Sequence, residues 1–186
     1  MSQINQIQEE LRQIEGGRFQ TLANQYLYRR YSLNNIIELG SQCGTDKTTT
    51  GVPDMYSVGE NGHYLFAAYT TSNSDIRNKL LNDAKDCLDR SKTGINPQLI
   101  DRIILCHTYF RLSPLVLEEV RAIDPRIEII GPETIASDLD GKYPALAHTV
   151  LGVPLGKGSF IAPDRFIERS LNDRFSTDLS KLLMHR

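Results

Sequence analysis

The sequence predicts an α/β domain in which helices flank a central mixed β-sheet. An Asn61-Gly62 pair between two apolar runs indicates a β-hairpin. Two further apolar runs, at residues 101–107 and 126–131, are each followed by a helical pattern that contains or begins at a proline. Strands that alternate with helices usually pair in parallel, so the hairpin and the later strands together predict a mixed sheet.

The N-terminal part of the chain is predicted to hold two helices and a short strand. Apolar residues recur at three- and four-residue steps over residues 4–14, which is typical of an amphipathic helix. The glycine pair 16–17 is expected to break or bend it. A second apolar face follows over residues 19–27, then a short apolar strand at 35–40 and a polar loop at 41–51.

The hairpin strands are expected at about residues 53–58 and 63–70. Ser74 and Asp75 are residue types that cap helices, and the pattern after them predicts a helix to about residue 91.

The remaining elements alternate between strand and helix. The apolar run 101–107 predicts a buried strand, residues 115–123 a helix, and residues 126–131 another strand. Pro132 then opens a short helix, and residues 143–152 form one more helical segment. We expect residues 1–160 to form one α/β domain, and residues 161–186 to form a C-terminal helical extension or a linker to a further region.

The composition is that of a globular protein, with 186 residues of which 40% are hydrophobic and 24% charged. No apolar run approaches the roughly 20 residues of a membrane helix, and the polar N-terminus is not a signal peptide. A net charge of −2 gives no global attraction to nucleic acid. Cys43, Cys87 and Cys106 form no CxxC pair, which argues against a disulfide framework or a zinc site and predicts a cytoplasmic location.

The hairpin carries the residues that bear most directly on function. Asp54, after Pro53, begins the first strand, and the second strand ends with Ala68, Tyr69 and Thr70. The start of the first strand lies beside the end of the second, so Asp54 should neighbour these residues, with positions 68 and 70 on one face. Carboxylates on neighbouring strands can hold Mg²⁺, which binds a scissile phosphate and lowers the pKa of an attacking water.

These segments resemble the PD-(D/E)xK nuclease superfamily. GVPD at residues 51–54 and FAAYTT at 66–71 are similar to the two halves of its signature, and the expected αβββαβ order also matches. The run EGGRFQTLANQYL at 15–27 resembles the first helix of Mrr-like restriction nucleases. Residues 103–114 and 127–139 are similar to stretches of N-terminal effector nuclease modules in bacterial anti-phage defence proteins.

The resemblance implies a restriction-endonuclease-like three-layer core and Mg²⁺-dependent cleavage of double-stranded DNA, with Mn²⁺ as a substitute metal. It also implies that Asp54, Glu15 and the backbone carbonyl of Tyr69 hold the metal. Such domains act as homodimers or higher oligomers, and the effector modules are fused to a larger sensor or ATPase protein. The resemblance therefore implies an anti-phage or restriction effector.

The chain departs from the family signature at two positions. Ala68 stands where the second acid is expected, and Thr70 stands where the lysine is expected. Either the domain is naturally degenerate or an acid was changed to alanine to silence a toxic nuclease; we favour the second and take glutamate as the native residue at position 68. The chain as written is then folded and inactive. Lys79, on the next helix, and Lys47, in the loop before Asp54, are candidate replacements for the lysine.

Two other functions remain open on the sequence. One is a non-catalytic DNA-binding or assembly module that kept the nuclease fold. The other is a nucleotide-binding α/β domain that uses the strand ends near His107 and Gly131. A hydrogen-bonded, half-buried side chain is the simpler interpretation of His107.

Overall fold

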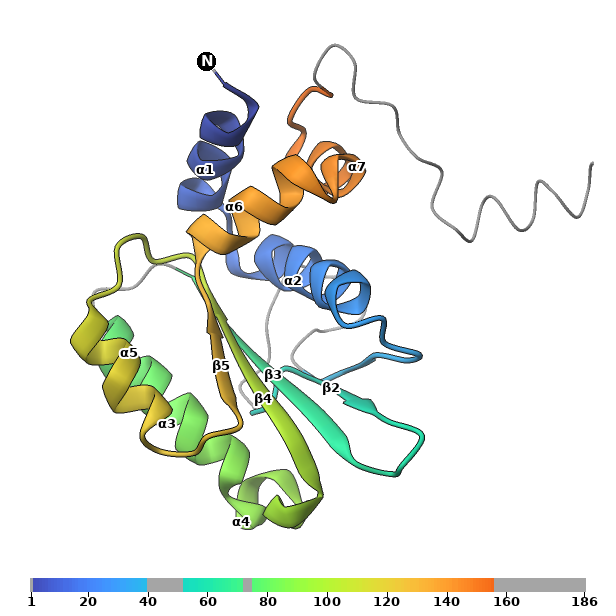
Figure 1. Ribbon diagram of the computed structural model, residues 1–186, viewed down its shortest axis with the longest axis vertical. Coiled ribbons are helices and arrows are strands. Elements are labelled where there is room, and N and C mark those ends of the chain that lie inside the picture. Colours follow the sequence, from blue (N-terminus) through green and yellow to red (C-terminus); the bar gives the residue numbers. More distant parts are fainter. Residues whose placement is uncertain (1, 40–51, 72–74, 156–186) are drawn as a thin grey trace, which may run out of the picture. The chain divides into compact units, whose positions relative to one another are not determined.

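The computed structural model describes residues 2–39, 52–71 and 75–155. The described part is a mixed α/β fold with a five-stranded sheet flanked by helices (Figure 1). This confirms the coarse fold class that the sequence predicts. The expected extension at residues 161–186 lies outside the described residues.

The strands pair in the order in which they occur in the chain, β1-β2-β3-β4-β5. β1 pairs antiparallel with β2 and β2 antiparallel with β3, whereas β3 with β4 and β4 with β5 are parallel. The mixed sheet therefore joins a hairpin meander to two helical crossovers, as predicted. The strands are β1 (Ile37–Glu38), β2 (Met55–Val58), β3 (Tyr64–Thr70), β4 (Ile100–His107) and β5 (Ile127–Ile130).

Helices cover both faces of the sheet (Figure 1). The two N-terminal helices and the last helices pack on one face, and α3 and α5 pack on the other. On the first face are α1 (Gln3–Gln13), α2 (Gly16–Arg30), α6 (Pro132–Gly141), α7 (Pro144–Leu146) and a π-helical turn (Ala147–Leu151). The others are α3 (Ile76–Leu88), α4 (Arg90–Thr93), a 3-10 turn (Pro97–Leu99) and α5 (Pro114–Arg121).

The hairpin turn forms as the Asn61-Gly62 pair predicts. Gly62 has φ = 77°, a left-handed conformation that glycine adopts without steric cost. The Asn61 side chain accepts a hydrogen bond from the backbone N–H of His63 at 3.1 Å, and that of Gly59 donates to the His63 carbonyl at 2.8 Å. The register Val58↔Tyr64 follows from this turn, and it fixes which residues of β2 and β3 share a face.

Some predicted boundaries differ from the observed ones. The glycine pair 16–17 does not break a helix internally: α1 ends at Gln13, and both glycines belong to the first turn of α2. The chain turns instead at Ile14 and Glu15, which are extended. The predicted strand 35–40 is reduced to Ile37–Glu38, and both of its residues are exposed at the edge of the sheet.

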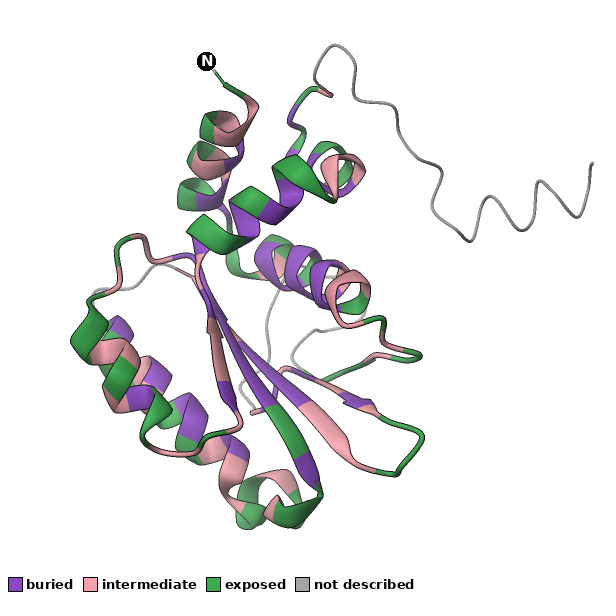
Figure 2. Cartoon of the chain, in the orientation of Figure 1, coloured by how far each residue is buried: buried purple, intermediate pink, exposed green. Residues whose placement is uncertain are grey.

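The core consists of two hydrophobic clusters, one on each face of the sheet. Figure 2 shows buried residues along the central strands and on the sheet-facing sides of α2 and α3. β4 pairs with a parallel strand on each side, and its run Ile103–His107 is buried throughout. Within the described ranges, no helix is both long enough and apolar enough to cross a membrane.

Candidate active site

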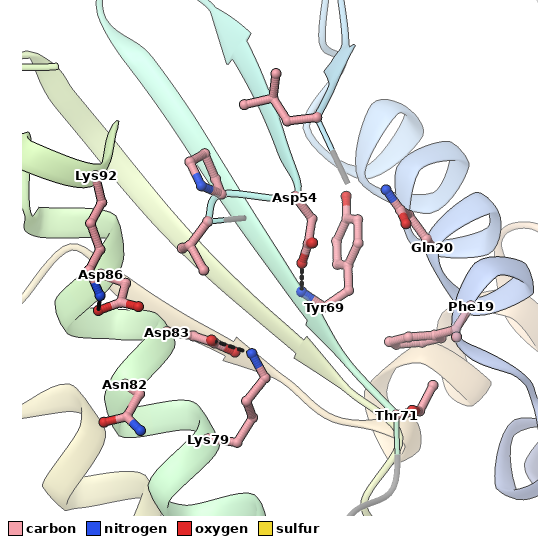
Figure 3. A pocket seen from close by; sticks show the side chains of 14 residues that line it. Phe19, Gln20, Asp54, Tyr69, Thr71, Lys79, Asn82, Asp83, Asp86 and Lys92 are labelled. Carbon is pink, nitrogen blue, oxygen red and sulfur yellow. Dashed lines mark hydrogen bonds and ion pairs between the residues drawn. The ribbon is translucent and has the colours of Figure 1, made fainter. Parts of the chain in front are cut away.

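A pocket of about 830 Å³ opens where β3 ends and the chain enters β2. Its walls come from α2, from the open end of the hairpin and from α3, and Figure 3 shows the side chains that line it. The lining includes three acids and two lysines. Its charged lining residues are Asp54, Lys79, Asp83, Asp86 and Lys92.

Asp54 lies beside the end of β3, as the sequence predicts. Its backbone N–H donates to the carbonyl of Ala67 at 2.9 Å, and its carboxylate Oδ2 accepts a hydrogen bond from the backbone N–H of Tyr69 at 2.7 Å (Figure 3). Burial raises the pKa of Asp54 to about 6; the Tyr69 N–H opposes the rise, and the negative charge of Asp83 adds to it.

Strand alternation directs Asp54 toward α3. Met55, its neighbour, is packed in the cluster on the α2 face, so the residues before and after it face the other way. Tyr56 and Ala68 both belong to the cluster on the α3 face. The Asp54 side chain therefore shares a face with position 68, the position of the expected second acid.

A second carboxylate enters the pocket from α3. Asp83 is only 3% exposed, and burial raises the pKa of its carboxyl group. Its Oδ1 accepts from Lys79 Nζ at 2.5 Å, and its Oδ2 accepts from Thr70 Oγ1 at 3.2 Å. Asp83 thus has a hydrogen-bond partner on each oxygen and also interacts electrostatically with Asp54.

Sequence reasoning missed Asp83, although the helix pattern carries a signal for it. The buried positions of α3 are Ile76, Leu80, Asp83, Ala84 and Cys87. Four of them are apolar and repeat at helical spacing, so an aspartate within that stripe must be buried. A buried aspartate is rare unless it is paired or functional.

The structure places Ala68 and Thr70 where the sequence predicts, on the face of β3 that α3 covers. Ala68 is 2% exposed and packs among the apolar residues of that cluster. Thr70 is 5% exposed, and its hydroxyl holds Asp83. Thr70 stands where the resemblance predicts a lysine, and here its hydroxyl orients Asp83 on the neighbouring helix.

The other predicted site residues have different outcomes. Lys79 lines the pocket and pairs with Asp83. Glu15 is exposed at the N-cap of α2 and is not among the residues that line the pocket, which its neighbour Gly16 does line. The Tyr69 backbone reaches the site through its N–H; the metal role of its carbonyl stays a prediction. Lys47 lies outside the described residues.

Two further groups of the pocket were not singled out in the sequence. Asp86 lies three residues after Asp83 on α3 and pairs with Lys92 at 2.6 Å. On the opposite wall, Gln20 of α2 is 4% exposed, and its amide Nε2 has no hydrogen-bond partner among the described residues. Figure 3 shows Gln20 extending from α2 toward Tyr69. A buried donor of this kind can bind an oxygen of a ligand or a water molecule.

His107, at the end of β4, pairs with Thr70 of β3 but is not among the residues that line this pocket. It is 2% exposed, and burial lowers its pKa to about 4. Its ring packs so closely against Gly131 that a Cβ there would come within 3.1 Å of the imidazole Cε1 and 3.2 Å of Glu133 Oε2. His107 is therefore fully buried rather than half-buried, and its Nδ1 has no hydrogen-bond partner among the described residues; the nucleotide-binding alternative stays a prediction.

Among the described residues, no group of three or more His, Cys, Asp or Glu side chains is arranged to hold a metal. Mg²⁺ typically uses only one or two carboxylates and keeps several waters or substrate oxygens. Asp54 and Asp83 line the same pocket and together offer two carboxylates.

Comparison of the chain with protein-family models, curated proteins and solved structures gives no significant match. Function is therefore inferred from the chemistry of the pocket and from the resemblance of short segments.

Proposed function

We propose that this chain is an Mg²⁺-dependent endonuclease that hydrolyses phosphodiester bonds of double-stranded DNA, with Asp54 and Asp83 as the metal ligands. The observation that carries this proposal is the convergence of two buried carboxylates and a lysine in one pocket. Burial raises the pKa of both carboxyl groups; the charge of Asp83 adds to the rise at Asp54, and the charge of Asp86 adds to the rise at Asp83. Two buried acids with raised pKa values, held beside one lysine in a pocket, are an arrangement found more often at functional sites than elsewhere.

The residues divide the chemistry of hydrolysis between them. When bound, the metal would polarise the scissile phosphate and lower the pKa of the attacking water. Asp54 and Asp83 would fix its position, because the Tyr69 N–H and the Thr70 hydroxyl orient their carboxylates. Lys79 would stabilise charge on the phosphate. Overall, a water hydroxyl joins the phosphorus, the bond to one sugar oxygen breaks, and that oxygen takes a proton.

The order of elements supports a restriction-endonuclease-like core. The expected αβββαβ order occurs from α2 to β4, and the chain adds α1 before it and a second crossover to β5 after it. In this proposal Asp83 takes the part of the acid that Ala68 lacks, and Lys79 the part of the lysine. The chain as written would then be active, in contrast to the silent enzyme expected when position 68 is considered alone. A dimeric anti-phage or restriction effector remains the biological role that the resemblance implies.

A non-catalytic DNA-binding or assembly module is the second candidate. It is favoured by the apolar packing of Ala68, since a family metal site would have a carboxylate there. It predicts a folded chain without metal-dependent cleavage.

The test is plasmid cleavage with Mg²⁺ or Mn²⁺ by the chain as written and by Asp54→Asn, Asp83→Asn and Ala68→Glu. We expect cleavage by the chain as written and loss of cleavage in both asparagine variants. Asp140→Asn, which changes an exposed acid on α6, is the matched control and should cleave normally.

Each alternative has its own outcome. Cleavage only after Ala68→Glu would show that the missing acid is the one at position 68 and would reject Asp83 as its replacement. No cleavage by any variant, at concentrations that force association, would favour the non-catalytic module.

A further inference from the structure

The Lys79–Asp83 pair occupies the site where the metal is proposed to bind. Lys79 Nζ lies 2.5 Å from Asp83 Oδ1 (Figure 3), and the Thr70 hydroxyl donates to Oδ2. The Asp83 side chain is 4% exposed, so water cannot readily replace a partner that its carboxylate loses. A divalent ion that binds Asp83 must therefore replace the ammonium group or crowd it.

The ammonium group of Lys79 is able to move away from Asp83. Its side chain is 43% exposed, against 4% for Asp83. The lysine chain is flexible and its ammonium group is strongly hydrated in water, so it loses little on moving away. Asp83, by contrast, is fixed in the core by its helix and by the hydroxyl of Thr70.

We propose that Lys79 is an internal counter-cation of Asp83, that a divalent metal displaces it, and that the released ammonium group then binds a DNA phosphate. This inference rests on the proposed function. Two cations held against one carboxylate repel each other, so a bound metal weakens the contact of Lys79 with Asp83, and the displaced group remains in the same pocket, beside the metal. Metal binding would thus turn a pocket that holds three acids into one that attracts phosphate.

The consequence is that metal and DNA bind cooperatively through Lys79. Without metal, the ammonium group is paired with Asp83, and the remaining acids repel DNA. With metal, the same group is available. Because coupling is reciprocal, DNA should tighten metal binding by the factor by which metal tightens DNA binding.

The first test measures metal affinity without DNA, by calorimetric titration with Mn²⁺. Lys79→Met removes the competing cation, so we expect its Kd for Mn²⁺ to fall by about fivefold or more relative to the chain as written. Lys79→Gln can still donate a hydrogen bond to Asp83 but carries no charge, so it should also bind Mn²⁺ more tightly than the chain as written. It replaces the methionine variant in this test if that variant folds poorly. Lys85→Met is the matched control, because Lys85 is exposed on the same helix and does not line the pocket.

The second test measures binding of a short DNA duplex by fluorescence anisotropy, with EDTA or with Ca²⁺. The chain as written and Lys85→Met should bind more tightly with Ca²⁺, by a factor on the order of tenfold. Both Lys79 variants should lose most of that increase although they bind metal better. A merely structural lysine would not shift the two affinities in opposite directions.

The outcomes separate this inference from the proposed function. If Mn²⁺ binding requires Asp54 and Asp83 but the Lys79 variants bind metal equally or more weakly, the displacement is wrong and the metal site stands. An unchanged Ca²⁺ effect on DNA binding in the Lys79 variants also overturns the displacement. If neither the chain as written nor any variant binds Mn²⁺, both proposals are wrong.

Discussion

Replacing Asp54 with asparagine should stabilise the metal-free protein at neutral pH. The pKa of Asp54 rises from its ordinary value of 3.8 to about 6 because the carboxylate is buried and lies near Asp83. Asparagine has nearly the same shape, and its carbonyl oxygen can still accept the hydrogen bond from the Tyr69 N–H. The substitution therefore removes the buried charge and leaves the packing almost unchanged.

The direction and size of the effect follow from proton linkage. Below about pH 4 the carboxyl group is protonated in both folded and unfolded chains, so it contributes no difference. Between about pH 4 and pH 6 only the folded chain keeps the proton, and stability falls as the pH rises. Since a tenfold change in a protonation equilibrium is worth about 1.4 kcal/mol, the loss at neutral pH is at most about 3 kcal/mol. The asparagine side chain of the variant is neutral throughout and avoids this loss.

Urea unfolding in EDTA measures the difference in the free energy of unfolding. At about pH 7.5 Asp54→Asn should be more stable than the parent by about 1–3 kcal/mol, and at about pH 4 the two should agree. Asp140→Asn should show only a small difference at either pH, because Asp140 is exposed. The reasoning is refuted if Asp54→Asn is less stable at neutral pH, or if its difference from the parent is the same at both pH values.

Three further substitutions test the fold around the site. Thr70→Val removes the hydroxyl that donates to Asp83 and should lower stability by about 1–3 kcal/mol in urea unfolding. A smaller loss would show that this bond is weak. Tyr26→Phe removes the buried 2.6 Å bond to Asp138 and should cost about 1–3 kcal/mol without changing the calorimetric affinity for Mn²⁺. Leu80→Ala opens a cavity beneath α3 and should cost about 2–5 kcal/mol; a loss below about 1 kcal/mol would contradict the burial described for this helix.

The hairpin was the most predictable part of the candidate site. Its turn is local, because Asn61 and Gly62 supply the conformation that a short connection between strands needs. Once that register is set, alternation alone places Asp54 beside the end of β3 and puts Ala68 and Thr70 on one face. That α3 covers this face comes from the packing of the helix. The turn residues and the two-residue alternation of the strands are thus enough to predict the part of the site that lies on the hairpin.

Asp83 could not be assigned to the site in the same way. The helical pattern implies that it is buried, but no rule of spacing says which strand residues it meets. Its contact with Thr70 joins positions thirteen residues apart in the chain, and the contribution of Gln20 comes from α2 on the opposite face of the sheet. These contacts depend on how α2 and α3 pack against the end of β3.

The sequence by itself determined the alternation of helices and strands, the hairpin, and the position of Asp54 beside the end of the second hairpin strand. These follow from local conformational preferences and from the periodicity of apolar residues, which are written along the chain. Only the tertiary structure decided that a helix supplies the second carboxylate and that Lys79 already neutralises it. The physical reason is that the burial and the charge partners of a side chain depend on which segments pack around it. Those segments are far apart in the sequence and meet only in the folded chain.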